Sequence, residues 1–414
     1  MRVLKVLTRT TVLGCAVSMI PAAALAGGWS TEGIADYGLM FEEGRFIVEG
    51  QATYGARNVD FENAETTIGG APLSVFGVDI GSDSADDMAP DLFVGSGSVK
   101  IGLTDNIDFF ARINEPYFIS EQPGFDWNGR FAIAETNADS LGFDAMLSYK
   151  HEISKGNFIR VFGGPRALTV NYEQLSRTLY PTGIPALPYL ELDAGIDVES
   201  DLEYGYRIGA SFEKPEIALR AMIAYESAID IDLDGDFAVS SSGVAVTGAP
   251  ASASATLPQS LEAKIQSGVA PGWMVSLGVK WTDWSVLDKL SVNLEGSDVQ
   301  IVRDLGYSDG WIVEAGVGHQ LTEKLSVGST VTWDKGIGGP YSDYYAFGLG
   351  GSYDLTDNLK FSLGGRAIYK TASEGVYDIA RIDSSTGATT RTVTNYDYDS
   401  SWNFALSSKI RLSF

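Results

Sequence analysis

The chain has 414 residues and carries 54 acidic against 29 basic side chains, a formal net charge of −25. This acidic balance excludes a nucleic-acid-binding protein, which needs a basic face to displace counterions from phosphates. With 47 glycines and an aromatic content of 11%, the composition indicates many strands and turns.

The first residues have the pattern of an export signal. A basic start is followed by a short apolar core over 11–20 and an Ala-x-Ala cleavage site at 24–26. We therefore expect residues 1–26 to be a signal peptide and the mature chain to begin at Gly27. The only cysteine, Cys15, lies in this leader, and a lipoprotein cleavage site that ends at this cysteine is the alternative. A mature chain without cysteine has no disulfide, thiol nucleophile or thiolate metal ligand.

The rest of the sequence predicts strands. No later stretch has 18 consecutive apolar residues, so no transmembrane helix is expected. Apolar and polar side chains alternate instead, as in 273–284, where Trp273, Val275 and Leu277 fall on one side of a strand. Fourteen such segments follow one another: 46–57, 92–103, 107–117, 140–151, 158–170, 202–213, 217–229, 259–269, 273–284, 311–320, 325–334, 344–354, 359–370 and 402–414.

The connections between these strands are of two kinds. Tight turns such as 104–106 and 270–272 alternate with connections of about 20 to 35 residues, which are 58–91, 173–201, 230–258 and 371–401. An even strand number with one rim of turns and one rim of long loops is typical of an outer-membrane barrel. A soluble sandwich is the alternative, but it would not sort its loops in this way. The sequence thus predicts an all-β fold, a transmembrane antiparallel β-barrel of about 14 strands over 46–414, in the bacterial outer membrane.

Catalysis and metal binding are not expected. The two histidines, His151 and His319, both lie next to short turns, far from the long loops where a cleft would form, and belong to no catalytic motif. Residues 230–235 resemble the start of a calcium-binding loop, but the twelfth position is Ser241 rather than Glu. We assign no enzyme activity, cofactor or metal site, and leave open a loose divalent-ion site on an acidic loop.

One long loop is unexpectedly apolar and stiffened by prolines. Its apolar residues are Leu179, Tyr180, Ile184, Leu187, Tyr189 and Leu190. Exposed apolar surface usually marks a binding site, and the other interpretation is a lid that folds inward over the barrel mouth. Both interpretations place a hydrophobic surface at the outer end of the barrel.

Two further sets of residues stand out in the expected wall. The polar faces of the strands carry many bases, among them Arg112, Arg207, Arg220, Lys264 and Lys280. They either form salt bridges across the lumen or line a path that selects solutes. In the third strand, Asn114 is followed two residues later by Pro116, which cannot donate to the strand ladder. Either the strand ends there, or the wall is kinked and locally unpaired, which lipid tolerates only at an opening.

The chain resembles the FadL-type outer-membrane transporters of long-chain fatty acids and other hydrophobic compounds. The resemblance is carried by Leu257-Pro258-Gln259-Ser260 and by Trp281-Thr282-Asp283-Trp284-Ser285. It implies a monomeric barrel with an N-terminal hatch, here 27–45, and a landing groove between 173–201 and 230–258. It also implies a lateral exit at the kinked third strand. The segment 27–45 is shorter than the family's hatch and lacks its Asn-Pro-Ala sequence, so no hatch residue is assigned.

We therefore expect passive uptake of long-chain fatty acids or neutral hydrophobic molecules across the outer membrane. Outer-membrane lipids and lipopolysaccharide are the expected surroundings, with divalent ions bridging the acidic loops to lipid phosphates. Two other functions are kept. A water-filled general porin would pass small polar solutes, and a surface receptor or structural barrel would use its loops while its lumen stayed sealed.

Overall fold

The computed structural model describes residues 28–34 and 37–414. The expected signal peptide and its cysteine lie outside these residues. Within them, no helix combines the length and hydrophobicity that would carry it through a bilayer.

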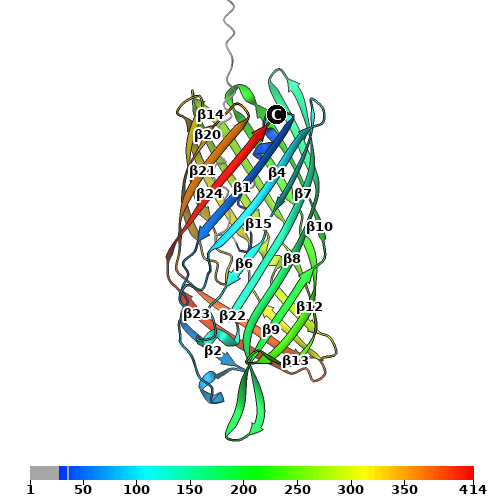
Figure 1. Ribbon diagram of the computed structural model, residues 1–414, viewed down its shortest axis with the longest axis vertical. Helices are drawn as coiled ribbons and strands as arrows, with labels where there is room; N and C mark the ends of the chain where they lie inside the picture. The colour runs from blue at the N-terminus through cyan, green and yellow to red at the C-terminus, as the bar shows by residue number, and fades with distance from the viewer. Residues whose placement is uncertain (1–27, 35–36) are drawn as a thin grey trace, which may run out of the picture.

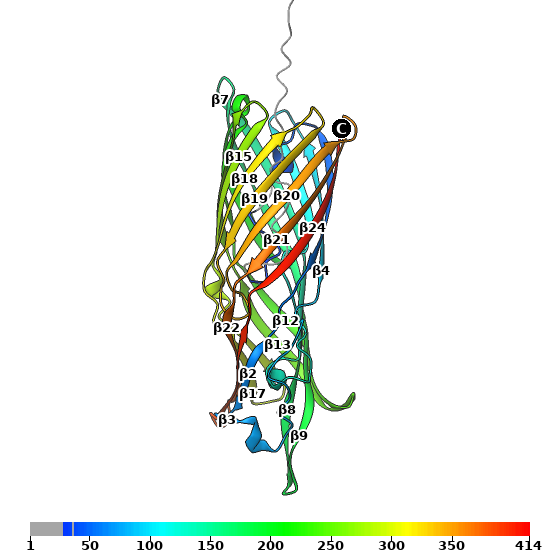
Figure 2. The same ribbon diagram turned by 90° about the vertical axis from the view of Figure 1, so that its left-hand side faces the viewer.

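Fourteen antiparallel strands close into a barrel, as the alternating sequence predicts (Figures 1 and 2). Each strand pairs with the next, and the last pairs with the first, so that Ile47 lies opposite Ser413. The strands are β1 (Phe46–Ala56), β4 (Leu92–Gly102), β5 (Ile107–Asn114), β7 (Glu135–Ser154), β8 (Asn157–Ile184), β10 (Glu203–Lys214), β11 (Leu219–Glu226), β14 (Ser260–Ala270), β15 (Trp273–Thr282), β18 (Gly310–Gln320), β19 (Leu325–Asp334), β20 (Tyr344–Asp354), β21 (Leu359–Lys370) and β24 (Ser401–Ser413).

The apolar face of these strands points outward and the polar face points into the lumen. In β24, for example, Phe404 and Leu406 are exposed, whereas Asn403, Ser407 and Arg411 are buried. A water-soluble protein would reverse this arrangement. The outward apolar band is therefore the lipid-facing surface of an outer-membrane barrel.

The long connections differ from the expected loops, because most of them form hairpins that continue the barrel as an outer sheet. Its strands are β8 with β9 (Leu187–Ser200), β12 (Ile229–Ser241), β13 (Val244–Leu257), β16 (Lys289–Leu294), β17 (Val299–Asp304), β22 (Ser373–Asp383), β23 (Thr389–Tyr398), β2 (Glu62–Ile68) and β3 (Ala71–Pro72), paired in that order. Pairing satisfies backbone groups that an open loop would leave to water. Short helical turns lie elsewhere along the described chain: α1 (Gly38–Phe41) before β1, η1 (Leu73–Phe76) after β3, η2 (Asn128–Phe131) before β7, η3 (Pro215–Ile217) between β10 and β11, and η4 (Trp284–Val286) after β15.

Residues 28–34 and 37–45, here called the N-terminal segment, lie against inward-facing side chains of the barrel. The Nζ atom of Lys280 donates to the Gly33 carbonyl (3.1 Å), and Arg411 forms an ion pair with Glu42 (2.6 Å). Nearer the long connections, Trp29 belongs to the largest hydrophobic cluster, which also contains Trp284 of η4. The described part of the N-terminal segment is thus held by the wall at several heights.

The lipid-facing assignment can be tested at Leu349, which lies in the middle of β20 and is 56% exposed. We expect Leu349→Lys to lower the free energy of unfolding in lipid vesicles by about 2–4 kcal/mol, because the ammonium group would lie in hydrocarbon. Leu355→Lys, in the turn after β20, is the control and should cost about 1 kcal/mol or less because that turn is at the interface. Equal small losses in urea titrations would contradict the assignment.

Candidate functional site

A pocket of about 580 Å³, here called the outer pocket, lies on the inner face of the outer sheet and is partly open to solvent. Residues of β8, β9, β12, β16, β17, β22, β23 and η2 contribute to it. Most of its lining is apolar: Phe131, Ile196, Phe237, Leu290, Val292, Ile301 and Ile379.

Two guanidinium groups also line the outer pocket. The Nη1 atom of Arg303 donates to the Tyr172 hydroxyl (3.0 Å) and to Gln174 Oε1 (3.3 Å). The Nη1 atom of Arg381 donates to Thr178 Oγ1 (2.6 Å). Within the described residues, neither arginine has a carboxylate at ion-pair distance. Burial lowers the pKa of Arg381, with no acidic neighbour to offset the effect. The pocket therefore combines apolar walls with two guanidinium groups that have no ion-paired carboxylate within the described residues.

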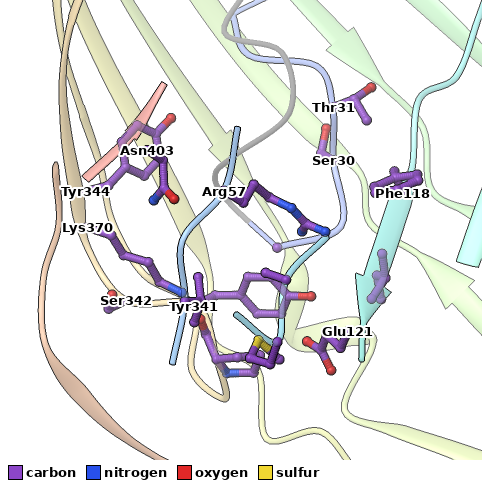
Figure 3. Close-up of a pocket in the computed structure, with 16 residues that line it drawn as sticks. Ser30, Thr31, Arg57, Phe118, Glu121, Tyr341, Ser342, Tyr344, Lys370 and Asn403 are labelled. Atoms are coloured by element: carbon purple, nitrogen blue, oxygen red, sulfur yellow. Dashed lines mark hydrogen bonds between the residues drawn. The ribbon is translucent and has the colours of Figure 1, made fainter. Parts of the chain in front are cut away.

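A second pocket, of about 770 Å³ and here called the inner pocket, lies between the N-terminal segment and the outer rim of the barrel (Figure 3). Two cations reach into it. Arg57 donates to the carbonyl groups of Pro90 (2.6 Å) and Ser120 (2.8 Å), and Lys370 donates to the carbonyl group of Pro340 (2.6 Å). Both side chains are thus held by neutral carbonyl oxygens.

One tyrosine contacts a lining residue of each pocket. The Tyr377 hydroxyl donates to Glu121 Oε2 (3.0 Å), and Glu121 lines the inner pocket. On its other side, the Arg303 guanidinium lies over the Tyr377 ring, 5.3 Å from the centroid. Tyr377 itself is buried. Tyr377 thus contacts one lining residue of each pocket.

The third wall strand is interrupted at the place where the sequence contains proline. β5 ends at Asn114, and pairing with β7 resumes at β6 (Phe118–Glu121). Gly142 of β7 lies opposite Asn114, and a Cβ atom there would lie 3.0 Å from the Pro116 ring. A glycine therefore allows the proline to pack against the neighbouring strand. We call residues 115–117 the strand break.

The backbone of the strand break is satisfied by side chains and by the N-terminal segment. Tyr117 N donates to the Ser140 hydroxyl (2.8 Å), which donates back to the Tyr117 carbonyl (2.9 Å). Thr31 N donates to the Pro116 carbonyl (2.9 Å), and Phe118 N donates to the Trp29 carbonyl (2.8 Å). The N-terminal segment thus adds a short strand where the wall lacks one.

On the side of the break nearer the short turns, charged side chains from five wall strands (β5, β7, β8, β10 and β11) and the N-terminal segment converge in the lumen. This lumen charge cluster consists of Glu32, Arg112, Asp144, Arg166, Arg207 and Glu226. Arg207 is 1% exposed, and Asp144 is buried between it and Arg112, at 3.0 Å and 2.8 Å. Buried charges must be paired in this way because isolated ones are too costly.

Glu32 is the contribution of the N-terminal segment to this cluster. Its Oε1 accepts from Arg112 Nη2 (2.6 Å) and Asn114 Nδ2 (2.8 Å), and its Oε2 accepts from Arg207 Nη2 (2.6 Å). Burial alone would raise the pKa of Glu32, but the positive charges of Arg112 and Arg207, with smaller effects of Arg166 and Lys280, hold this pKa well below its ordinary value. Glu32 is therefore ionised and fully coordinated.

The other bases that the sequence singles out have different surroundings. The Arg220 guanidinium lies over the Phe41 ring of the N-terminal segment, 3.8 Å from its centroid. Lys280 is buried and contacts the Gly33 carbonyl. Lys264 lies opposite Gly278 and Met222 and forms no ion pair within the described part of the chain. The structure therefore brings Arg112, Arg207 and Asn114 together and leaves Lys264 apart.

The apolar run 179–190 lies at the tip of the β8–β9 hairpin, which projects farthest from the barrel (Figures 1 and 2). Four of its six predicted site residues are exposed: Tyr180, Ile184, Leu187 and Leu190. Tyr189 packs edge-on against Phe76 of η1, with 5.2 Å between the ring centroids. None of the six lines the outer or the inner pocket.

Among the described residues, the fold places neither the two histidines nor the calcium-like sequence in a catalytic or metal-binding arrangement. His319 stacks on Trp273, with 4.1 Å between the ring centroids, and His151 stacks on Tyr149. The stretch 230–235 is part of strand β12, so its aspartates do not curl around a common centre. In residues 28–34 and 37–414, no group of three or more His, Cys, Asp or Glu side chains is arranged to hold a metal ion.

Sequence reasoning missed both arginines of the outer pocket, although a signal was present. Ile301 and Arg303 lie two residues apart, as do Ile379 and Arg381, so each arginine falls on the apolar face of a short alternating segment. An arginine on an apolar face is unusual and could have been noticed. Glu32 had no such signal, because no periodicity surrounds it.

Comparison with known proteins adds relatives of similar sequence. "Outer membrane protein P1" of Haemophilus influenzae is 28% identical over 201 residues, which are 47% of this chain and 43% of that protein. "Long-chain fatty acid transport protein" of Escherichia coli is 24% identical over 294 residues, 60% of this chain and 62% of that protein. The matches thus span about half of the length of these relatives.

Solved structures share the fold. A FadL homologue of Pseudomonas aeruginosa superposes with a TM-score of 0.71 at 16% identity, covering 91% of this chain and 92% of that one. The toluene transporter TodX of P. putida superposes with a TM-score of 0.55 at 12% identity, covering 91% of each chain. A family profile described as outer membrane protein transport protein (OMPP1/FadL/TodX) matches residues 40–374. The chain is a bacterial outer-membrane protein and belongs to the OMPP1/FadL/TodX family of transport proteins.

Proposed function

We propose that this protein is a passive channel, not an enzyme, that takes up long-chain fatty acids or related amphiphilic acids across the outer membrane. The observation that carries the proposal is the outer pocket, where Arg303 and Arg381 enter an apolar cavity without a carboxylate partner among the described residues. An apolar wall suits an alkyl chain, and a guanidinium binds a carboxylate through charge-assisted hydrogen bonds. A neutral hydrocarbon would use only the first feature.

The charge distribution is compatible with an anionic substrate despite the acidic chain. The acidic side chains of β12, for example Asp232 and Asp234, point away from the buried inner face of the outer sheet. We propose that divalent ions bridge this acidic surface to lipopolysaccharide phosphates and that the barrel acts as a monomer. The arginines inside would then supply the local positive potential that a carboxylate meets.

The proposed route follows the two pockets. A substrate would land on the apolar residues between the β8–β9 and β12–β13 hairpins, from Leu179 to Leu190, and enter the outer pocket. It would pass Tyr377 into the inner pocket and leave sideways at the strand break next to Asn114 and Pro116. The adjacency of Phe118 to both the inner pocket and the break supports this last step.

A general porin is the weaker alternative. It needs a wide aqueous lumen, whereas the lumen charge cluster buries Arg166 and Arg207 almost completely and the N-terminal segment contacts the wall around them. A sealed receptor would bind ligands without solute flux. Uptake of fatty acid and flux of sugar separate the fatty acid channel, the porin and the receptor.

Charge removal in the outer pocket tests the substrate class. We expect Arg303→Gln with Arg381→Gln to lower palmitate uptake at limiting concentration by about thirtyfold, because each lost charged hydrogen bond weakens binding by about 1 kcal/mol or more. Uptake of a neutral hydrocarbon of similar length should stay unchanged. The measurement uses labelled compounds and cells that have no other channel of this kind.

Arg391→Gln is the matched control, because Arg391 is exposed and ion-paired with Asp378 on the same hairpin. It should leave both rates unchanged. Equal loss of palmitate and hydrocarbon uptake in the double variant would remove the case for a carboxylate site. Sugar flux into liposomes that contain the purified barrel would identify a porin.

A disulfide lock tests the lateral exit. Ser30 and Tyr117 are partners in an antiparallel bridge, so cysteines at both positions are close enough to form a disulfide. We expect oxidised Ser30→Cys/Tyr117→Cys to reduce palmitate uptake to the level of cells without the channel, and a reductant to restore it. Each single variant is a control for the thiol. Undiminished uptake by the oxidised protein would show that the N-terminal segment need not leave the break.

A further inference from the structure

We propose that Arg112, Asn114 and Arg207 form a carboxylate-binding site and that Glu32 occupies it as a built-in substitute for the substrate. This inference rests on the proposed uptake of an acid and names the residues that would receive its head group inside the barrel. The site is separate from the outer pocket, because its donors come from β5 and β10, on the side of the strand break nearer the short turns.

The coordination of Glu32 is that of a bound ligand. Both of its oxygens are engaged, by two guanidinium groups and one amide, at 2.6 to 2.8 Å. The donors lie on different wall strands and converge on a carboxylate that arrives from a separate part of the chain. An arginine pair and an amide in this geometry would recognise any monocarboxylate that could reach them.

Without Glu32, the lumen charge cluster would have one excess positive charge, which a monoanion would neutralise. Without Glu32, the wall contributes three guanidinium groups, Arg112, Arg166 and Arg207, against two carboxylates, Asp144 and Glu226. One positive charge would then stay buried without a partner, which is costly. A fatty acid carboxylate would restore the balance, whereas an alcohol of the same length would not.

The site lies beside the inner pocket and at the strand break. Ser30 and Thr31 line the inner pocket, and Glu32 follows them directly in the chain. Asn114, which donates to Glu32, is the last residue of β5 before the break. The Thr31 hydroxyl donates to the Glu115 carbonyl, and Thr31 N donates to the Pro116 carbonyl.

Replacement of Glu32 by a substrate carboxylate would therefore have a second effect. It would remove the ion pairs of Glu32 and leave residues 29–31 held by neutral hydrogen bonds and by the packing of Trp29. Binding of the head group would thus be linked to uncovering the wall. Under the plain structural alternative, Glu32 is only a salt bridge, and no external acid would replace it.

The first experiment asks whether a free carboxylate fills the site when Glu32 is removed. We expect Glu32→Ala to melt at a lower temperature than wild type and acetate to recover most of that loss. Acetamide, which has the same shape but no charge, should recover none. Acetate should have no effect on wild type or on Glu32→Ala/Arg207→Gln. This measurement needs no uptake, so it remains informative even if the protein carries no fatty acid.

Two further variants keep this test decisive. Glu32→Gln has the size of glutamate and serves if the alanine variant does not fold; it should respond to acetate less than alanine does, because its amide fills the space. Glu42→Ala removes another acid of the N-terminal segment, whose partner Arg411 also pairs with Glu49, and should not respond. Absence of acetate rescue in Glu32→Ala, or equal rescue in Glu42→Ala, would overturn the proposal.

The second experiment measures binding of palmitate and hexadecanol to the purified full chain in detergent. We expect Glu32→Ala to bind palmitate about tenfold more tightly than wild type, because the competing carboxylate is gone, and to bind hexadecanol equally well. Unchanged or weaker palmitate binding in a folded Glu32→Ala protein would overturn the proposal. Failure of wild-type cells to take up palmitate, together with acetate rescue of Glu32→Ala, would instead overturn only the proposed function.

Discussion

The requirement that every backbone N–H and C=O group in hydrocarbon has a partner governs this structure. Fourteen strands meet it by closing on themselves, with β24 against β1. The strand break at 115–117 is where the ladder of the third wall strand fails. There the missing bonds are supplied by Ser140 and by residues 29–31. The hydrogen bonding of the wall at the break thus depends on the N-terminal segment, which is separate from the wall strands.

The two faces of the barrel wall carry opposite kinds of side chain. Lipid faces apolar side chains, whereas the lumen holds guanidinium and carboxylate groups in close pairs. Each pair is stable only while all of its members are present, because a buried charge that loses its partner is more costly than the pair was worth. Under the proposal above, displacement of the N-terminal segment would therefore require another anion to take the place of Glu32.

The sequence was most informative where the physical constraint was strongest. Lipid on one side and water or polar groups on the other impose a strict period of two, so all fourteen wall strands and the proline at the break were predictable. The outer hairpins were missed. In the β12–β13 hairpin, the strand 244–257 alternates only weakly. The strand 229–241 begins with strict alternation, but its aspartates resemble part of a calcium-binding loop. Glu32 and Arg112 are 80 positions apart, and only the closed barrel brings them together. Their pairing was therefore invisible in the sequence.

Strand β8 runs without interruption for 28 residues, whereas about ten are enough to cross a bilayer. Arg160 and Arg166 in the lumen, Tyr172 beside the outer pocket and Tyr180 at the tip are thus positions on one continuous element. In a continuous strand, an insertion of two residues moves the tip outward by about 7 Å, and every side chain stays on its own face of the sheet. An insertion of one residue moves every side chain between the insertion and the tip to the opposite face. The reach of the hairpin above the membrane can therefore diverge between related barrels only in steps of two, while the pocket chemistry stays in place.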